Sequence, residues 1–309
     1  MKLFLGVDGG QSSTTALVGD ESGQVVGVGR GGPSNHVGKG EGREKFLQAV
    51  GGSLRAAGFE DARFEAACLG LSGGAADKDA AVRELIKAKH YVVTHDAFIA
   101  LVGATAGEPG VVAIAGTGSI AFGRNGAGKT ARAGGWGYVF GDEGGGFDLV
   151  RQALRAALRE EEGWGPRTAL RDALVSSAGA TSANDLLHRF YTDEYPRERV
   201  AAFARLVDRV ARDGDIAARE ILFAGAQQLA TLAGAVRAQI FDGIAPCSIS
   251  YIGGVFRSDI LLARYRMLME LEEGNHVAEP VYGPAAGALI EAYRAAGFTV
   301  SLTGAPAEK

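Results

Sequence analysis

One pattern of short strands occurs twice in this sequence, first from Leu3 and again from Val111. The first copy reads LFLGVDGGQSSTTALVGDESGQVV and the second reads VVAIAGTGSIAFGRNGAGKTARAG. Each copy consists of an apolar strand, a loop of small residues, a second strand, a turn and a third strand. Such a repeat is typical of a domain-sized unit rather than of a short solenoid repeat, so the sequence predicts an internal duplication.

The rest of the chain alternates strand-like and helix-like patterns, which predicts an α/β protein. The pattern restarts after the turn signal Glu108-Pro109-Gly110, so a second domain is expected to begin at residue 111. The expected strands are 3–7, 15–18, 24–29, 66–71, 91–94, 111–115, 119–123, 129–132, 248–252 and 277–281. The expected helices are 42–57, 76–88, 96–106, several within 146–241, 258–272 and 284–296.

Glycine makes up 47 of the 309 residues, about twice the usual share of roughly 7%. These glycines cluster after apolar runs, which indicates backbone that passes close to a ligand such as a phosphate. The charges nearly balance, with 32 basic and 36 acidic side chains and a net charge of −4. Because neither sign dominates, no nucleic-acid or membrane partner is expected.

The two cysteines, Cys68 and Cys247, lie in the apolar runs AACLGL and APCSIS. Both are expected to be buried, reduced thiols. The sequence has no C-x-x-C pair, so a structural zinc site or a cysteine-ligated cluster has little support. Reduced thiols are typical of the cytoplasm, which is the expected location.

The segment 123–130, GRNGAGKT, satisfies the P-loop pattern G-x-x-x-x-G-K-[ST]. A P-loop requires a long helix after it, whose N-terminus faces the phosphates. Here the glycine-rich segment ARAGGWGYVFGDEGGG follows, which excludes a regular helix. Since Asn125-Gly126 is a strong hairpin signal, an exposed turn is predicted instead.

The segment 70–74, GLSGG, fits the nucleophile elbow G-x-S-x-G of α/β-hydrolases. A catalytic Asp and then a His would have to follow on later loops, but His188 and His276 lack any motif context. Ser72 is therefore predicted to be a turn residue near a cleft.

Two loops have residues suited to phosphate binding. The first, DGGQSS from Asp8 to Ser13, follows an apolar strand and offers backbone N–H groups and hydroxyls. Asp8 could hold Mg²⁺, directly or through water. The loop AGTGS, from Ala115 to Ser119, occupies the same place in the second copy and has the same chemistry. Two such loops from paired domains could hold a triphosphate between them.

The segment Thr94-His95-Asp96-Ala97 lies between an expected strand and an expected helix. A carboxylate at Asp96 suits a general base, and an Asp before a helix equally suits an N-cap. A metal-dependent phosphohydrolase would need further His and Asp ligands, which five scattered histidines supply poorly. The residues alone leave the base and the cap open.

The segment 134–144, GGWGYVFGDEG, fits neither a helix nor a strand. It combines glycines, aromatic side chains and two adjacent carboxylates, and loops of this kind often have a function. Trp136 is interpreted either as a packing anchor or as part of a binding site.

Seven motifs, taken in their order along the chain, resemble those of the sugar kinases in the actin-like ATPase superfamily. They are GVDGGQSST, GPSNH, THDA, IAGTGS, GGWGYVFGDEG, YIGGVFRS and YGPAAGA. The nearest group looks like the N-acetylglucosamine kinase and archaeal-type hexokinase branch, grouped with the BadF/BadG/BcrA/BcrD-type ATPases. The resemblance covers essentially the whole chain. It implies two ribonuclease-H-like domains around a central cleft, one made of 1–110 with 284–309 and the other of 111–283.

The resemblance also implies which residues form the site. Asp96 matches the catalytic base, and Asp8 matches a residue that serves Mg²⁺. The other matches are Gly9, Gly10, Gln11, Ser12 and Ser13 in the first phosphate loop, Gly116, Thr117, Gly118 and Ser119 in the second, Gly253, Gly254 and Ser258 at the adenosine, and Asn35, His36, Gly135, Trp136 and Asp142 at the sugar, which Ser119 is also expected to contact. Relatives often have Gly-Thr-Lys or Gly-Thr-Arg where this chain has Gln11-Ser12-Ser13, so their basic residue has no counterpart here.

The implied activity is transfer of the ATP γ-phosphate, with Mg²⁺, to the 6-hydroxyl of N-acetylglucosamine or a related sugar. Glucosamine, glucose and N-acetylmuramic acid are the related substrates considered. The expected partner is a small sugar, and the expected assembly is a homodimer.

Two alternatives come from the same superfamily. The first is an activator ATPase of acyl-CoA dehydratases or reductases, which carries a cysteine-ligated iron–sulfur cluster at a dimer interface. The unrelated contexts of Cys68 and Cys247 count against it. The second is a nucleotide-dependent scaffold without small-molecule turnover, against which the segments GPSNH and GGWGYVFGDEG count.

Overall fold

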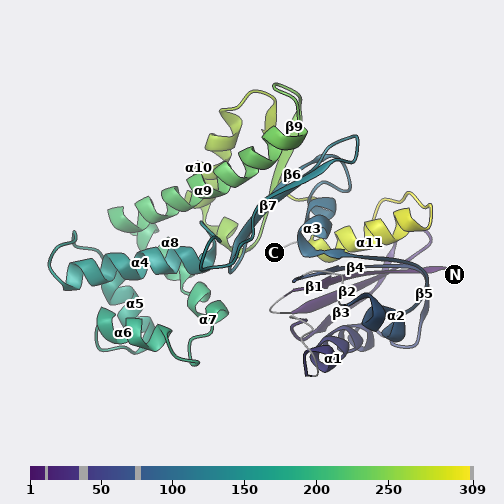
Figure 1. Ribbon diagram of the computed structural model, residues 1–309, viewed down its shortest axis with the longest axis horizontal. Coiled ribbons are helices and arrows are strands. Elements are labelled where there is room, and N and C mark those ends of the chain that lie inside the picture. Colours follow the sequence, from purple (N-terminus) through teal and green to yellow (C-terminus); the bar gives the residue numbers. More distant parts are fainter. Residues whose placement is uncertain (11–12, 35–40, 74–77, 307–309) are drawn as a thin grey trace. The chain divides into compact units, whose positions relative to one another are not determined.

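The computed structural model describes residues 1–10, 13–34, 41–73 and 78–306. The chain divides into two compact units, which are treated separately below (Figure 1). Unit 1 consists of Met1–Gly110 together with Glu279–Lys309, and unit 2 consists of Val111–Ala278. No helix within the described ranges is both long and apolar enough to cross a membrane.

Unit 1 is built on a five-stranded sheet in the order β3-β2-β1-β4-β5. Strands β1 and β2 pair antiparallel, as do β2 and β3, whereas β4 pairs parallel with both β1 and β5. The carboxyl ends of β1, β4 and β5 therefore meet at one edge of the sheet. The strands are β1 (Leu3–Gly9), β2 (Thr14–Asp20), β3 (Val25–Gly31), β4 (Arg63–Leu71) and β5 (Lys87–His95).

Helices cover both faces of this sheet. Helices α1 (Glu41–Ala56) and α2 (Asp79–Leu85) pack on one face, with Leu5 and Val7 of β1 in that core. Helices α3 (Asp96–Ala104) and α11 (Pro284–Ala295) pack on the other, where Phe4 lies (Figure 1). The alternation of side chains along β1 explains why neighbouring residues enter different cores.

Gly6 allows α11 to approach the sheet closely. A Cβ at this position would overlap the backbone of α11 at Leu289. The last helix of the chain is thereby packed directly against the first strand, although the two are far apart in the sequence.

Unit 2 repeats the same sheet order. Its strands follow the order β10-β9-β6-β7-β8, so the first strand of each unit is central and the next two extend to one side. The predicted duplication is confirmed by this identical topology. The strands are β6 (Gly110–Ala115), β7 (Ser119–Arg124), β8 (Thr130–Gly134), β9 (Cys247–Ile252) and β10 (Asn275–Val277).

Unit 2 differs from unit 1 by a large helical insertion between its third and fourth strands. The long helix α9 (Ile216–Ile240) packs on β7 and β8, and the other helices of the insertion pack against it or against α4. The remaining helices of unit 2 are α4 (Gly146–Glu161), α5 (Leu170–Ala178), α6 (Ala183–Phe190), α7 (Arg197–Ala202), α8 (Ala204–Arg212), a 3₁₀ turn at Gly254–Arg257 and α10 (Asp259–Glu270).

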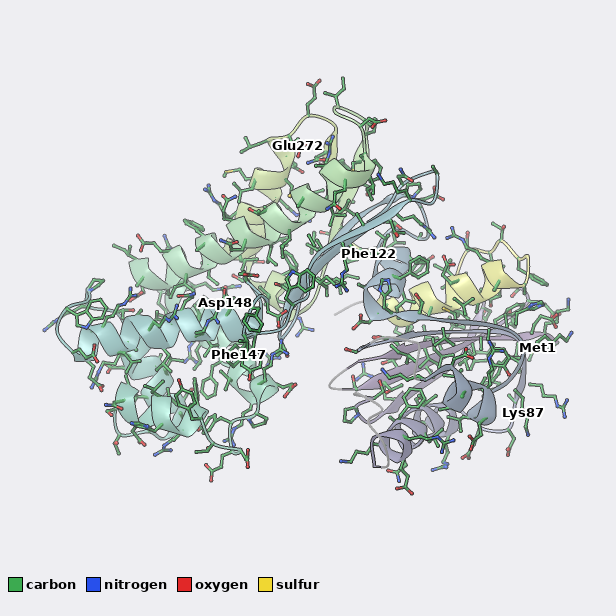
Figure 2. All side chains as sticks on the ribbon, viewed as in Figure 1. Met1, Lys87, Phe122, Phe147, Asp148 and Glu272 are labelled. Atoms are coloured by element: carbon green, nitrogen blue, oxygen red, sulfur yellow. The ribbon has the colours of Figure 1, made fainter. Side chains whose placement is uncertain are left out.

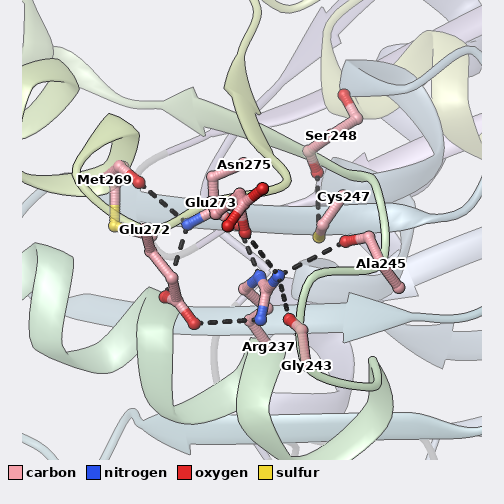
Figure 3. Close-up of polar contacts among 9 residues, drawn as sticks. All are labelled: Arg237, Gly243, Ala245, Cys247, Ser248, Met269, Glu272, Glu273 and Asn275. Carbon is pink, nitrogen blue, oxygen red and sulfur yellow. Dashed lines mark hydrogen bonds and ion pairs between the residues drawn. The ribbon is translucent and has the colours of Figure 1, made fainter.

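A buried arginine ties the end of α9 to the turn before β10 (Figure 3). Arg237 is 2% exposed. Its guanidinium donates to Glu272 Oε1 at 2.9 Å, to Asn275 Oδ1 and to the backbone carbonyl oxygens of Gly243, Ala245 and Glu273. A buried cation is tolerated here because its donors find acceptors. This cluster belongs to the scaffold of unit 2.

Two expected elements are wrong in their extent. The strand expected at 277–281 is β10 at Asn275–Val277, where Val277 pairs with Ile249 and Pro280 has no N–H to continue the ladder. The helix expected at 76–88 ends at Leu85, because β5 begins at Lys87 and pairs with Arg63. In both places pairing with a neighbouring strand overrides the local pattern.

Candidate functional site

The first glycine loop joins β1 to β2 and is braced by backbone hydrogen bonds. The Gly10 N–H donates to the Ser13 carbonyl oxygen at 3.0 Å, and the Ser34 N–H donates to the Gly10 carbonyl oxygen at 3.1 Å. From β4, the Ser72 N–H donates to the Gly9 carbonyl oxygen at 2.9 Å. These bonds hold Gly9, Gly10 and Ser13 at the carboxyl edge of the sheet.

Gly9 has no room for a side chain. A Cβ there would lie 2.6 Å from both Leu71 Cδ2 and Ser34 Oγ. By contrast, the nearest atom to a Cβ on Gly10 would be the Ser13 carbonyl oxygen at 3.2 Å. Gly9 is therefore needed for packing, and Gly10 adds no side chain to the surface of the loop.

His95, not Asp96, caps helix α3. The His95 Nδ1 accepts a hydrogen bond from the Phe98 N–H at 3.1 Å, and α3 begins at Asp96. The half-buried Asp96 carboxylate accepts only a bond from the adjacent Ala97 N–H, at 2.9 Å, among those between described residues. The cap interpretation of Asp96 is therefore wrong, and the carboxylate is available for other work.

Asp8 and Asp96 lie at the same edge and on the same face of the sheet. Asp8 follows Phe4 and Gly6 at two-residue spacing, so its side chain is on the face that α3 and α11 cover. Asp8 is in register with Gly70 of β4, which is in register with Thr94 of β5. Two strand spacings of ~4.8 Å separate β1 from β5, so the backbones of Asp8 and Thr94 lie roughly 10 Å apart, and Asp96 follows two residues after Thr94.

The second glycine loop joins β6 to β7 and contacts the first turn of α4. Phe147 and Asp148 belong to this turn (Figure 2). The Gly146 N–H donates to the Gly116 carbonyl oxygen at 2.8 Å, and the Phe147 N–H donates to the Thr117 carbonyl oxygen at 3.0 Å. Within the loop, the Gly116 N–H donates to the Gly118 carbonyl oxygen at 3.0 Å. The N–H groups at the start of α4 thus hold the loop in place.

Asp142 also contacts this loop, through the Ser119 N–H. Its backbone is left-handed, with φ of 63°, and the residue is buried. One carboxylate oxygen accepts the Ser119 N–H at 3.3 Å, and the other forms an ion pair with Arg197. Ser119 Oγ donates to the Glu143 carbonyl oxygen at 2.7 Å. Left-handed backbone is uncommon outside glycine and is often found at functional sites.

Gly253 is brought against the second loop. Its φ is 114°, and a Cβ there would overlap the carbonyl oxygen of Ala115 and lie 3.1 Å from the Gly116 nitrogen. Gly254 is exposed beside it. Ser258 is buried, and its Oγ caps α10 by accepting the Leu261 N–H at 3.3 Å.

The segment that follows β8 presents aromatic side chains to solvent. Trp136 is 64% exposed and Phe140 is 85% exposed, so Trp136 is not an anchor in the core of unit 2. Arg132 lies over the Trp136 ring at 5.1 Å. Gly135, with φ of 72°, is exposed, and its N–H donates to the Ser119 carbonyl oxygen at 3.0 Å. This segment begins against the second loop.

Four of the predicted site residues lie outside the described residues. They are Gln11, Ser12, Asn35 and His36. The rest fall into two sets. Unit 1 holds Asp8, Gly9, Gly10, Ser13 and Asp96, and unit 2 holds Gly116, Thr117, Gly118, Ser119, Gly135, Trp136, Asp142, Gly253, Gly254 and Ser258.

The P-loop match forms a hairpin turn, as predicted. The Asn125 N–H donates to the Lys129 carbonyl oxygen at 3.0 Å, and strand β8 follows at Thr130 in place of a helix. Lys129 Nζ donates to the Gln239 carbonyl oxygen at 2.7 Å, at the end of α9. This lysine serves the scaffold of unit 2.

The nucleophile-elbow match is also a turn, as predicted. Ser72 is buried and follows β4 directly. Its carbonyl oxygen accepts a hydrogen bond from Lys78 Nζ at 2.5 Å. The histidines considered as partners of Ser72, His188 and His276, lie in unit 2. They belong to α6 and β10.

Both cysteines are buried thiols, as predicted. Cys68 lies on β4 within the core of unit 1, and Cys247 lies on β9 within the core of unit 2. Burial raises the pKa of the Cys68 thiol and raises the pKa of Cys247 to about 11. Inward-facing sulfur atoms are poorly placed to hold a cluster at a surface between two protein copies.

Sequence reasoning missed Arg197. It begins α7, 55 residues after Asp142, and its guanidinium lies 5.3 Å from the centre of the Tyr138 ring. No local pattern distinguishes this arginine from a solvent-facing one. A signal in hindsight is Pro196, which starts the short helix that presents Arg197.

A concavity of about 490 Å³ lies between α4 and α9 and contains none of the predicted site residues. Asp148 and Arg151 form part of its wall and are paired at 2.6 Å. Asp148 also accepts the Gly144 N–H at 3.0 Å, and Arg151 donates to the Tyr138 carbonyl oxygen at 3.2 Å. These bonds connect α4 to the segment that carries Asp142 and thereby support that segment.

The chain is similar to known proteins along most of its length. The model of the BadF/BadG/BcrA/BcrD ATPase family matches residues 5–292. An N-acetylmuramic acid/N-acetylglucosamine kinase of Clostridium acetobutylicum is 32% identical over 236 residues, which cover 74% of this chain and 77% of that protein. An N-acetyl-D-glucosamine kinase of Dictyostelium discoideum is 28% identical over 94% of this chain and 97% of its own.

A solved structure is similar along nearly its whole length. It is that of a candidate N-acetylglucosamine kinase from Chromobacterium violaceum, with a TM-score of 0.73 and 26% identity. The match covers 94% of this chain and 98% of that one.

Proposed function

The chain belongs to the BadF/BadG/BcrA/BcrD ATPase family, and we propose that it is an ATP-dependent sugar kinase. The phosphate acceptor is the 6-hydroxyl of N-acetylglucosamine or of a related hexose or amino sugar. The named kinases among its relatives act on sugars of this class, which supports the proposal.

The position of Asp96 carries this proposal. A general base must lie within hydrogen-bond reach of the hydroxyl whose proton it takes. Because His95 performs the capping of α3, Asp96 starts the helix with its carboxylate half-buried at the functional edge of the sheet. It would orient the sugar hydroxyl and take its proton as the phosphoryl group is transferred.

The two glycine loops would bind the phosphates of ATP. Phosphoryl transfer passes through a loose transition state, so the protein contributes mainly positioning and electrostatic stabilisation. Both loops, residues 8–13 and 116–119, are rich in glycine, so their backbone could approach the phosphates closely. Gly253 and Gly254, beside the second loop, would accommodate the adenosine, with Ser258 holding the helix that follows.

The sugar would lie near Asp142, Gly135 and Trp136. Asp142 can accept hydrogen bonds from sugar hydroxyls, and the exposed Trp136 ring offers a flat apolar surface to a sugar ring. Asn35 and His36 are proposed for the same site on the family resemblance alone.

Asp8 suits Mg²⁺ by its chemistry. Mg²⁺ takes oxygen ligands and is commonly held by one or two carboxylates together with waters and substrate phosphates. The half-buried Asp8 carboxylate, at the end of β1 beside the glycine loop, fits that role without a cage of protein ligands. The ion would neutralise charge on the phosphates.

We propose two domains for this kinase, one made of residues 1–110 with 284–309 and the other of residues 111–283. A cytoplasmic homodimer completes the proposal.

The test is a coupled assay of ADP release from Mg-ATP. Glucose, glucosamine, N-acetylglucosamine, N-acetylmannosamine and N-acetylmuramic acid are each supplied in turn. ADP release that depends on one or more of these sugars supports the kinase and gives its specificity. ADP release at the same rate without any sugar would overturn it in favour of an activator or scaffold ATPase.

A further inference from the structure

Arg197 contacts Asp142 and Tyr138 of the segment that follows β8 and lies close to Gly118 of the second glycine loop. It pairs with the Asp142 carboxylate and lies over the Tyr138 ring at 5.3 Å. Its Nη2 atom would be 2.6 Å from a Cβ on Gly118. The side chain is 23% exposed, so much of the charge is removed from water.

We propose that Arg197 is a positioning residue for the sugar, and that it acts through Asp142. This inference rests on the proposed sugar kinase activity and adds a residue from the helical insertion to its site. Neither glycine loop contains this residue, and it comes from a helix that unit 1 does not have.

The state of Asp142 gives the physical reason. Its carboxylate is buried and its backbone is left-handed, so the arrangement needs support from its surroundings. The Ser119 N–H satisfies one oxygen, and the Arg197 guanidinium satisfies the other. A buried carboxylate without a cation is costly, so it would turn away or take up a proton. Either change removes an acceptor that the sugar hydroxyls need.

The geometry of Arg197 explains why a lysine would not replace it fully. Its planar guanidinium pairs with Asp142 while the guanidinium carbon lies over the Tyr138 ring. A lysine ammonium keeps the charge but cannot combine the two contacts in the same way. Arg197→Lys should therefore recover part of the lost sugar affinity, and Arg197→Gln should recover little.

The test is a double-mutant cycle measured by steady-state kinetics. Arg197→Ala, Asp142→Asn and the double variant are compared with the wild type on the sugar that the wild type phosphorylates. We expect Arg197→Ala to raise the sugar KM by about 10- to 100-fold, as for the loss of a hydrogen bond to a charged group. The ATP KM should change less than about threefold.

The cycle separates an action through Asp142 from a general loss of structure. If Arg197 acts through Asp142, the double variant should have about the same sugar KM as Asp142→Asn alone. A sugar KM of the double variant that equals the product of the two single effects would overturn the proposal. A rise of the ATP KM as large as that of the sugar KM would also overturn it. If Arg197→Ala melts well below the wild type, Arg197→Gln, which keeps the stem of the side chain over Tyr138, takes its place in the cycle.

Arg199→Ala is the matched control. Arg199 lies two positions later on α7, is exposed, and donates to the Glu194 carbonyl oxygen at 2.6 Å. Its removal should leave both KM values within about twofold of the wild type. An absence of sugar-dependent turnover in the wild type would overturn the proposed function and this inference together. A wild type that is active with an additive cycle would overturn only the role of Arg197.

Discussion

The two glycine loops occupy equivalent places in duplicated sheets, yet they are held in opposite ways. The first loop includes its own carboxylate, Asp8, and the carbonyl oxygens of Gly9 and Gly10 accept backbone bonds from neighbouring segments of unit 1. The second loop contains no acidic residue. It takes Asp142 from a segment 23 residues further on, and its carbonyl oxygens rest on the N–H groups of α4.

This difference shows that the two units share their strand order and not the contacts that support their glycine loops. The strand order, which depends on alternating apolar residues, is the same in both units. The supports of the second loop come from Asp142 and Arg197, which belong to the segment and the helical insertion that follow its third strand. In the proposed site both loops bind phosphate, unit 1 provides the carboxylates for the metal and the base, and unit 2 provides the sugar contacts at Gly135, Trp136 and Asp142.

The largest effect is expected at the base. Asp96→Asn should lower kcat by ~10²–10⁴-fold, the range for removal of a general base. ATP affinity should stay within about twofold, because Asp96 makes no bond to the described residues of either glycine loop. Steady-state kinetics and ATP titration measure the two quantities. Asp61→Asn, an exposed carboxylate of the same unit, is the matched control. Near-normal turnover of Asp96→Asn would remove the assignment.

A medium effect is expected in the second loop, where two glycines differ. A Cβ on Gly118 would overlap the Asp142 carboxylate, whereas a Cβ on Gly116 meets no atom within 4 Å. Gly118→Ala should therefore lower the free energy of unfolding by about 1–3 kcal/mol, as for other overpacked sites. Gly116→Ala should unfold like the wild type and raise the ATP KM, because its methyl group would face the phosphates. Denaturant unfolding and kinetics of the pair check this.

The opposite order would contradict the description of the second loop. If Gly116→Ala proved the less stable variant, the contact of Gly118 with Asp142 and Arg197 would not be what holds the loop. If Gly116→Ala left the ATP KM unchanged, this loop would not lie against the phosphates.

The smallest effect concerns the helical insertion that only unit 2 has. Hydrogen bonds from Arg189 and from the Thr181 backbone hold the pKa of Asp185 at about 2. A lowered carboxyl pKa contributes stability above the unfolded value of about 3.9, and this stability is lost as the pH falls toward 2. Asp185→Asn should therefore be slightly less stable than the wild type at pH 7. The difference should shrink below pH 4 in denaturant unfolding. A difference that grows on acidification would contradict the sign.

The sequence predicts the scaffold well because the scaffold depends on local patterns. Alternating apolar residues locate the strands of both sheets, and the hairpin signal at Asn125-Gly126 excludes the P-loop. The edge strand β10 is misplaced because it is short and is defined by pairing with β9. The pattern at 277–281 is apolar but contains Pro280, which ends the pairing.

The site is less predictable because its supports are distant in the sequence. His95 caps α3 in place of Asp96, and the sequence cannot distinguish two adjacent polar residues at a helix start. Arg197 reaches Asp142 across 55 residues, in a region rich in exposed arginines. Contacts of this kind require the tertiary structure.

The most direct test of the central claim is to identify the product. The wild-type protein is incubated with Mg-ATP and N-acetylglucosamine, or with whichever sugar of the panel it accepts, and the mixture is analysed by phosphorus-coupled NMR. The account predicts a sugar phosphorylated on the 6-hydroxyl and one ADP for each sugar phosphate. Release of inorganic phosphate with no sugar phosphate from any sugar of the panel would contradict it.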